Sequence, residues 1–136
     1  MDHKQRRDAA QLVAAQNGLH VVVIGTPVPK RKQERARNKS LTSLIVELHG
    51  FGVDQLYIEA REPALNDRDI RTVAQARQTR LPKGTRVHAD HVPGSTEPLL
   101  WISDIVAGAV RADRTGDRQY TALLDNVIDF EISTDC

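Results

Sequence analysis

Two acidic side chains stand where a site that cleaves phosphodiester bonds would need them. Glu59 ends an alternating apolar segment, and Asp104 falls in the second turn of an expected helix. Carboxylates hold one or two Mg²⁺ or Mn²⁺ ions roughly 4 Å apart, which neutralise phosphate charge and activate a water molecule. The sequence therefore predicts Glu59 and Asp104 as catalytic acids and metal ligands. The alternatives are structural: an ion pair from Asp104 to an arginine, and a solvent-facing Glu59 paired with Arg61.

The spacing around Asp104 also predicts how its helix packs. Trp101, Ile105 and Gly108 recur at steps of three and four, so they share a helix face with Asp104. We expect this face to pack on a sheet and to aim the carboxylate inward. A carboxylate on such a face is costly unless it is paired or binds a metal.

A histidine is the third catalytic candidate. Strand alternation across residues 87–91 places His88 and Asp90 on one face and His91 on the other, so the three do not form one ligand set. His91, at the strand end, is predicted to assist proton transfer or product release near neutral pH. The alternative is a histidine at a sheet end with no specific role.

Basic residues cluster although the net charge of the chain is only +1. They are Lys30, Arg31, Lys32, Arg35, Arg37 and Lys39. Arg35, Arg37 and Lys39 are predicted to hold a nucleic-acid backbone, in contacts that weaken with added salt. The alternative for the whole cluster is a solvated helix face.

Composition excludes several other classes. Aromatic residues make up 4% of the chain, too few for a base-stacking platform. No nucleophile elbow, phosphate-binding loop or dinucleotide fingerprint is present. The single cysteine, Cys136, predicts a reducing, cytoplasmic location. The longest apolar run, residues 21–25, is too short to span a bilayer, so no membrane role is expected.

The hydrophobic pattern predicts one α/β domain over residues 1–136, with an open, largely parallel sheet and helices packed on it. Helices are expected at 4–16, 32–49, from Asn66 or Asp67 to 80, at 97–112 and at 117–126. Strands are expected at 19–26, 54–60, 85–92 and 127–133, the last at an edge. In such sheets the functional crevice lies beyond the carboxyl ends of the strands.

Four motifs resemble a known family. They are Arg35-Ala36-Arg37, Leu56-Tyr57-Ile58-Glu59-Ala60-Arg61, Asn66 with Asp69, and Glu97-Pro98-Leu99-Leu100-Trp101-Ile102-Ser103-Asp104. Residues 35–112 resemble the actinobacterial type of an RNase H-like domain-of-unknown-function family, the 3800 family. The resemblance implies an RNase H-like sheet and a metal-dependent nuclease-type site. Glu59 matches its strand-end acid, Asp104 its helix acid, and His91 an accessory histidine.

The chain departs from this family at its start. Members usually begin with a strand carrying an Asp-Glu-Ser motif, which supplies the central metal-binding aspartate, and these residues contain none. We therefore expect a shortened member or a chain that begins upstream, and an incomplete sheet edge that favours homo-oligomers. The missing aspartate leaves a second interpretation, a non-catalytic RNase H-like scaffold used for binding or oligomerisation.

Overall fold

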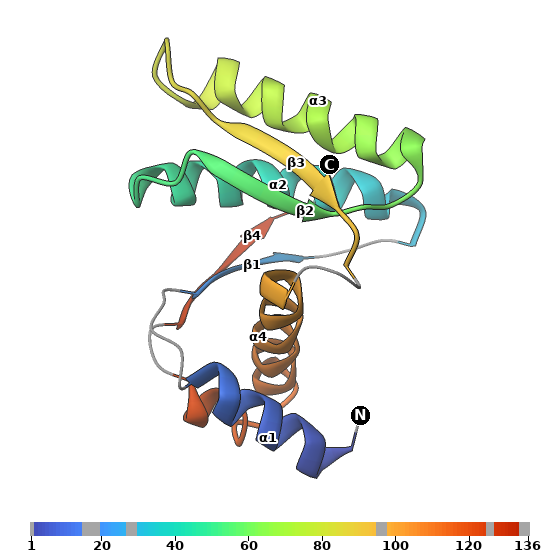
Figure 1. The fold of residues 1–136 in the computed structure, drawn as a ribbon, viewed down its shortest axis with the longest axis vertical. Coiled ribbons are helices and arrows are strands. Elements are labelled where there is room, and N and C mark those ends of the chain that lie inside the picture. The colour runs from blue at the N-terminus through green and yellow to red at the C-terminus, as the bar shows by residue number, and fades with distance from the viewer. Residues whose placement is uncertain (1, 15–19, 27–29, 95–97, 125–126, 134–136) are drawn as a thin grey trace. The chain divides into compact units, whose positions relative to one another are not determined.

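A computed structural model describes residues 2–14, 20–26, 30–94, 98–124 and 127–133 (Figure 1). In chain order its elements are α1 (His3–Ala14), β1 (His20–Thr26), η1 (Lys30–Lys32), α2 (Gln33–Gly50), β2 (Gln55–Glu59), α3 (Pro63–Arg80), β3 (His88–Val92), α4 (Pro98–Arg114), η2 (Thr121–Leu123) and β4 (Val127–Ser133). Strands β1 and β4 pair with each other, and β2 pairs with β3. The protein is therefore mixed α/β, with two small parallel sheets.

The contacts divide the chain into two compact units. One unit contains residues 1–22 and 97–129, and the other contains residues 23–96 and 130–136. Helices α1 and α4 belong to the first unit, and α2, β2, α3 and β3 belong to the second.

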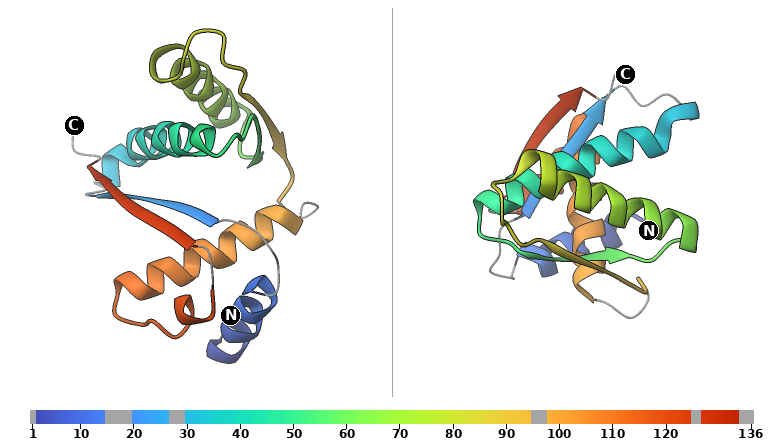
Figure 2. Two further views of the ribbon diagram at one scale, coloured as in Figure 1. Left: turned by 90° about the vertical axis from the view of Figure 1, so that its left-hand side faces the viewer. Right: turned by 90° about the horizontal axis from the view of Figure 1, so that it is seen from above.

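The second unit is built on a β–α–β segment. Strands β2 and β3 are parallel, with Gln55 opposite His88 at one end and Glu59 opposite Val92 at the other. Helices α2 and α3 run side by side, and the two strands lie along them (Figure 2). The core between them contains Ile45, Val73, Ala76, Leu81 and Val87, against which Leu41, Val46, Leu56, Ile58 and Ala89 pack.

Alternation fixes which strand residues reach this core. Leu56 and Ile58 of β2 pack inward, whereas Tyr57 and Glu59 are exposed on the other face. The same rule places Ala89 and His91 of β3 inward and leaves His88 and Asp90 exposed. The expected separation of His91 from His88 and Asp90 is confirmed.

Helix α2 ends as its glycines predict. Gly52 has a φ of 81°, a left-handed conformation that a glycine adopts without strain. Its N–H donates to the carbonyl of His49, and the N–H of Val53 donates to the carbonyl of Leu48. These bonds satisfy the last free carbonyl groups of the helix and turn the chain into β2.

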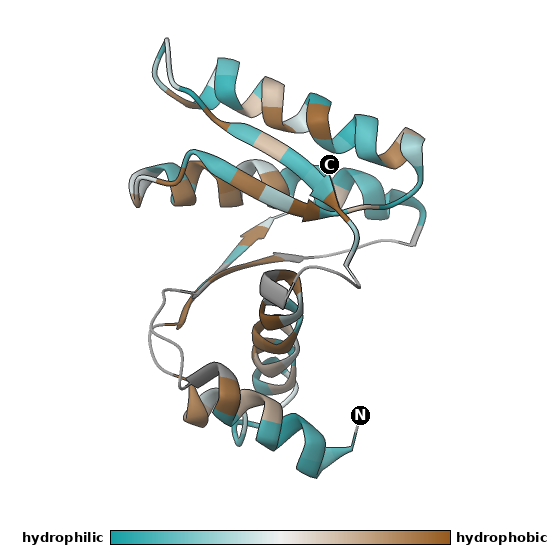
Figure 3. Ribbon diagram, in the orientation of Figure 1, coloured by the Kyte–Doolittle hydropathy of each residue, from teal (hydrophilic) through white to brown (hydrophobic). Residues whose placement is uncertain are grey.

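The first unit has its own core around α4. Ala10, Val106, Ala109, Tyr120 and Leu124 are buried there. Helix α4 is largely hydrophobic along its length, whereas α3 is mainly hydrophilic (Figure 3). His3 joins α1 to the segment before η2, because its Nδ1 lies 2.6 Å from the Tyr120 hydroxyl. None of the described helices is long and apolar enough to cross a membrane.

Most predicted elements are present, and three predictions are wrong in detail. Helix α3 begins at Pro63 rather than at Asn66 or Asp67, because proline suits the first helical turn, where its missing N–H costs nothing. Strand β3 begins at His88, not at residue 85, after the turn at Gly84. Instead of a helix at 117–126, the described part of that segment has one short 3-10 turn.

The remaining differences concern the sheet and the element ends. A single open sheet was expected, but the described strands form two separate pairs. The first strand was predicted to begin at Leu19 and the last strong helix at Glu97. Both positions lie outside the described residues, as do residues 15 and 16 of the first helix and 125 and 126 of the expected helix.

Candidate functional site at the carboxyl ends of the parallel strands

A fully buried carboxylate is the centre of the most highly connected polar cluster described. Asp69 of α3 has no exposed side-chain surface. Arg37 of α2 approaches it side-on, with Nε 3.3 Å from Oδ1 and Nη2 3.2 Å from Oδ2. Arg61, just beyond β2, donates from Nη2 to Oδ1 at 2.7 Å. The third partner of Asp69 is His91 of β3, whose Nε2 lies 3.2 Å from Oδ2. We call Asp69, Arg37, Arg61 and His91 the Asp69 cluster.

Arg61 is held by more than this carboxylate. Its Nη1 donates to Glu34 Oε1 at 2.6 Å, and its Nη2 also lies 3.4 Å from the Leu65 carbonyl oxygen. Its backbone N–H donates to Asn66 Oδ1 at 2.7 Å. Asn66 was predicted to cap α3, and it instead ties the turn before that helix. The guanidinium is therefore fixed between the start of α2 and the start of α3.

The electrostatics of the cluster favour the charged form of Asp69. Burial alone raises the pKa of a carboxyl group, because it removes water from the charge. Hydrogen bonds from Arg37 and His91, with the positive charges of Arg37 and Arg61, outweigh burial and lower the pKa of Asp69 below its usual value. The hydrogen bond that Arg61 donates to Glu34 similarly raises the pKa of Arg61, against a smaller opposing effect of burial. Asp69 and Arg61 are thus held as an ion pair.

Glu59 lies at the carboxyl end of β2, as predicted, on the opposite face of the strand pair from His91. Its side chain is exposed. It does not pair with Arg61, which engages Glu34 and Asp69 instead. Gly94, in the segment after β3, lies directly against the Glu59 carboxylate, and a Cβ there would overlap it. Because Gly94 has no side chain, the Glu59 carboxylate has room at this position.

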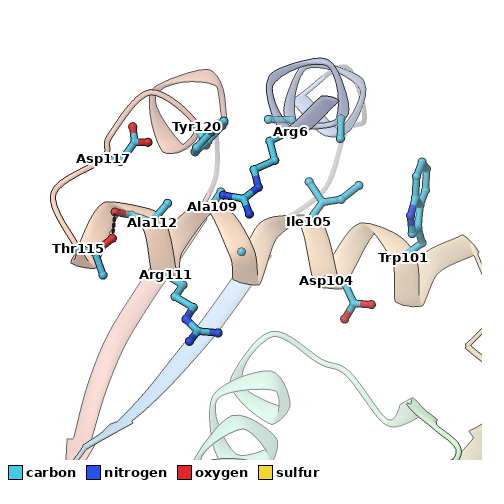
Figure 4. A pocket seen from close by; sticks show the side chains of 13 residues that line it. Arg6, Trp101, Asp104, Ile105, Ala109, Arg111, Ala112, Thr115, Asp117 and Tyr120 are labelled. Atoms are coloured by element: carbon cyan, nitrogen blue, oxygen red, sulfur yellow. Dashed lines mark hydrogen bonds between the residues drawn. The ribbon is translucent and has the colours of Figure 1, made fainter. Parts of the chain in front are cut away.

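Asp104 lies in the other unit, on α4, and its predicted orientation is wrong. The buried face of α4 is formed by Val106, Ala109 and Val110 with Ile102 and Ile105 packed beside them, and Asp104 is exposed. Asp104 and Arg111 project from the side of α4 that faces away from Arg6 and Tyr120 (Figure 4). The apolar face of α4 therefore differs from the expected one. Ile105 belongs to the core, whereas Trp101 and Gly108 are exposed beside Asp104.

Asp104 also borders a pocket of its unit. This pocket, of about 580 Å³, lies between α1, α4 and the segment that follows α4, and Arg6, Trp101 and Tyr120 help to line it (Figure 4). Asp104 forms no ion pair with any residue that the structure describes. The arginine partner considered as its structural explanation is therefore absent from the described part of the chain.

The basic residues of α2 divide between two surfaces. Arg37 turns to Asp69, and 39% of its side chain is exposed. Arg35 and Lys39 instead line a groove between α2 and α3. Four-residue spacing places Arg35 and Lys39 on one helix face and turns Arg37 to another. That these three residues hold a nucleic-acid backbone stays a prediction.

A metal would have few ligands within either unit. Across residues 2–14, 20–26, 30–94, 98–124 and 127–133, no three His, Cys, Asp or Glu side chains gather in a group that could hold one. Glu59 belongs to the second unit and Asp104 to the first. Each unit therefore supplies one of the two predicted ligands.

Comparison with known proteins adds no family to this geometry. No family model, curated protein or solved structure matches the chain. The resemblance to the 3800 family rests on the motifs alone, and it stays a prediction.

Sequence reasoning gave Asp69 no role, although a signal was present. Asp69, Thr72, Val73 and Ala76 are all buried, and they stand at the i, i+3, i+4 and i+7 positions of one helix face. An acid at the head of such a stripe must be paired to be buried. Arg37, Arg61 and His91, all singled out in the sequence, are its partners.

Proposed function

We propose that this chain is an RNase H-like, metal-dependent nuclease-type protein that cleaves phosphodiester bonds. Glu59 and Asp104 are its divalent-metal ligands, and His91 is its accessory histidine. The observation that carries the proposal is the exposed Glu59 carboxylate at the carboxyl end of a parallel β–α–β segment, with the anchored Arg61 two residues later. The carboxyl ends of parallel strands are the usual place for an active site.

Besides acidic residues, such a reaction needs fixed positive charges, and the Asp69 cluster supplies them. Phosphodiester cleavage develops negative charge on the phosphate, and prepositioned cations stabilise it without reorganising. Asp69 prepositions Arg37 and Arg61, because a buried carboxylate holds both guanidinium groups. The part of Arg37 that remains exposed is available to a phosphate.

The same carboxylate supports a proton-transfer role for His91. When the Nε2–H of His91 donates to Asp69, the neutral ring carries its lone pair on Nδ1. A carboxylate that fixes the tautomer in this way makes the second ring nitrogen a proton acceptor. Only 11% of the His91 side chain is exposed, so the ring is also held in place.

Two carboxylates suit the metal expected here. Mg²⁺ commonly binds proteins through one or two carboxylates and completes its shell with water and substrate phosphate oxygens. Glu59 and Asp104, both exposed, offer oxygen ligands of that kind. A bound Mg²⁺ or Mn²⁺ would neutralise phosphate charge and lower the pKa of a water molecule.

Cleavage assays test the proposal directly. The full chain is incubated with Mg²⁺ or Mn²⁺ and with single-stranded, double-stranded and hybrid nucleic acids. We expect metal-dependent cleavage that falls by about 100-fold or more in Glu59→Gln and in Asp104→Asn, because each loses a ligand charge. Glu47→Gln, an exposed acid of α2, is the matched control and should cleave normally. Cleavage that survives Asp104→Asn would contradict the assignment.

A second candidate is a non-catalytic RNase H-like scaffold for binding or oligomerisation. The observation that favours it is that the described residues gather no group of three metal ligands. A thermal-shift titration with Mn²⁺ separates the two candidates, because only a protein that binds the ion in its folded state is stabilised by it. Light scattering on the same sample measures its oligomeric state.

A further inference from the structure

A basic groove of the second unit is lined by residues of α2, α3 and the end of β4, and neither proposed metal ligand is among them. Its volume is about 590 Å³, and it lies wholly within the second unit. Arg35 and Lys39, one turn apart on α2, line one side, and Arg80 at the end of α3 lines the other. No carboxylate is among the described residues that line it. The groove is therefore electropositive.

Two of these cations are not neutralised within the described chain. Arg35 and Arg80 are both exposed, and neither forms an ion pair with a described residue. Arg37, by contrast, is committed to Asp69. On α2, Arg37 therefore shares its charge with a carboxylate, whereas Arg35 has no ionic partner among the described residues.

The groove also offers hydrogen-bond acceptors. Thr42, Thr72 and Thr79 are among the residues that line it. The hydroxyl group of each donates its proton to the backbone carbonyl four residues earlier, of Asn38, Arg68 and Gln75 respectively. Each threonine oxygen therefore presents only lone pairs to a ligand. Asn38 Oδ1 is buried in the same lining and has no hydrogen-bond partner in the described structure.

Cations and acceptors together select one ligand chemistry. A phosphodiester group would pair with the cations, but it has no proton to donate to the acceptors. A ribose–phosphate backbone has both, because every 2′-hydroxyl can donate a hydrogen bond. No aromatic side chain is among the described residues that line the groove, so these residues offer nothing on which a base could stack.

We infer that the α2–α3 groove binds the backbone of single-stranded RNA, with phosphates on Arg35 and Arg80 and 2′-hydroxyl groups on the threonine oxygens. This binding requires no metal, and it holds whether or not the chain cleaves nucleic acid. It predicts recognition that depends on the sugar and on salt, not on base sequence.

Fluorescence anisotropy with labelled RNA and DNA of one sequence tests the inference. The full chain is titrated in EDTA, so that failure of metal-dependent cleavage does not affect the result. Each phosphate contact to a single strand contributes about 0.7 to the slope of log K against log salt, which is roughly fivefold in affinity at about 0.1 M salt. We expect Arg35→Ala and Arg80→Ala each to lose that amount.

Two further variants make the test specific. Arg71→Ala removes an exposed arginine of α3 that does not line the groove, and it should bind RNA normally. Thr42→Val keeps the side-chain shape but removes an acceptor, so it should weaken RNA binding and leave DNA binding unchanged. All of these positions lie at the surface or partly so, and a thermal melt confirms folding.

Three results would overturn the inference. Equal affinity for RNA and DNA would remove the role of the acceptors. A loss in Arg71→Ala as large as in Arg35→Ala would show attraction to general positive charge. Competition by poly-glutamate as effective as by unlabelled RNA would show that the groove binds any polyanion.

Discussion

The Nε2 atom of His91 lies 3.2 Å from Oδ2 of Asp69, a carboxylate with no exposed surface. The contact joins the carboxyl end of β3 to the middle of α3. Through the same carboxylate, Arg37 connects α2 and Arg61 connects the end of β2. One buried side chain therefore fixes the edge of the β–α–β segment at which Glu59 lies.

The first prediction concerns the stability that this carboxylate provides. Asp69→Asn keeps the side-chain size but leaves Arg37 and Arg61 without a compensating charge, and its amide N–H₂ competes with their donors. We expect the free energy of unfolding to fall by about 3 kcal/mol, as when one member of a buried ion pair is removed. Urea denaturation measures this change. Asp67→Asn, an exposed neighbour on α3, should change it by less than about 0.5 kcal/mol. Equal effects of the two substitutions would contradict a central role for Asp69.

The second prediction concerns pH. The pKa of Asp69 is lower in the folded chain than its ordinary value of 3.8, since the arginine and histidine hydrogen bonds outweigh burial. Its contribution to stability is therefore complete above 3.8 and is lost as the pH falls through the lower folded pKa. The limiting slope for one such group is about 1.4 kcal/mol per pH unit. Urea denaturation at a series of acidic pH values should show a shallower decline for Asp69→Asn than for the wild type. Parallel declines would show that other groups cause the acid sensitivity.

The element pattern could be predicted because hydrophobic period and chain breakers are local properties. Helix α2 ends within one residue of its expected end, and the expected second strand is present as β2, with Ile58 packed inward. The start of α3 was misplaced because Asn66 has the side chain of a helix cap and Pro63 can equally begin a helix. In the structure Asn66 bonds the Arg61 N–H instead, a choice that depends on the path of the chain after β2.

The candidate site was less accessible to sequence reasoning because it depends on contacts between distant segments. Arg37 and Asp69 lie on different helices, and nothing in their local sequence pairs them. The inward orientation expected for Asp104 failed because two neighbouring helix stripes both contain apolar residues. Only the packing of Val106 and Ala109 decides between them.

The third prediction uses Gly94 to move the Glu59 carboxylate without removing it. In Gly94→Ala the new Cβ would overlap that carboxylate, which must swing aside. Because the obstacle is the end of a flexible, exposed side chain, we expect a change in unfolding free energy below about 0.5 kcal/mol. If Glu59 is a metal ligand, Mn²⁺ affinity should nevertheless fall toward that of Glu59→Gln. Calorimetric titration measures this affinity.

Gly50→Ala, whose Cβ would meet nothing within 4 Å, is the control and should bind Mn²⁺ as the wild type does. Unchanged affinity in Gly94→Ala would remove Glu59 from the metal site.

The fourth prediction asks whether Glu59 and Asp104, one in each unit, act on the same ion. At a Mn²⁺ concentration of about 100 Kd, a single site should stabilise the folded chain by about 2.7 kcal/mol. We expect Glu59→Gln and Asp104→Asn each to abolish most of this gain, and the double variant to lose no more than either single variant. Such non-additivity is the signature of residues that act together.

Glu47→Gln is the control and should retain the full gain in stability from Mn²⁺. Independent, additive losses would mean two separate weak sites, and a wild-type chain that Mn²⁺ does not stabilise would favour the scaffold. The cycle thus measures, without a cleavage assay, whether the two carboxylates meet at one metal.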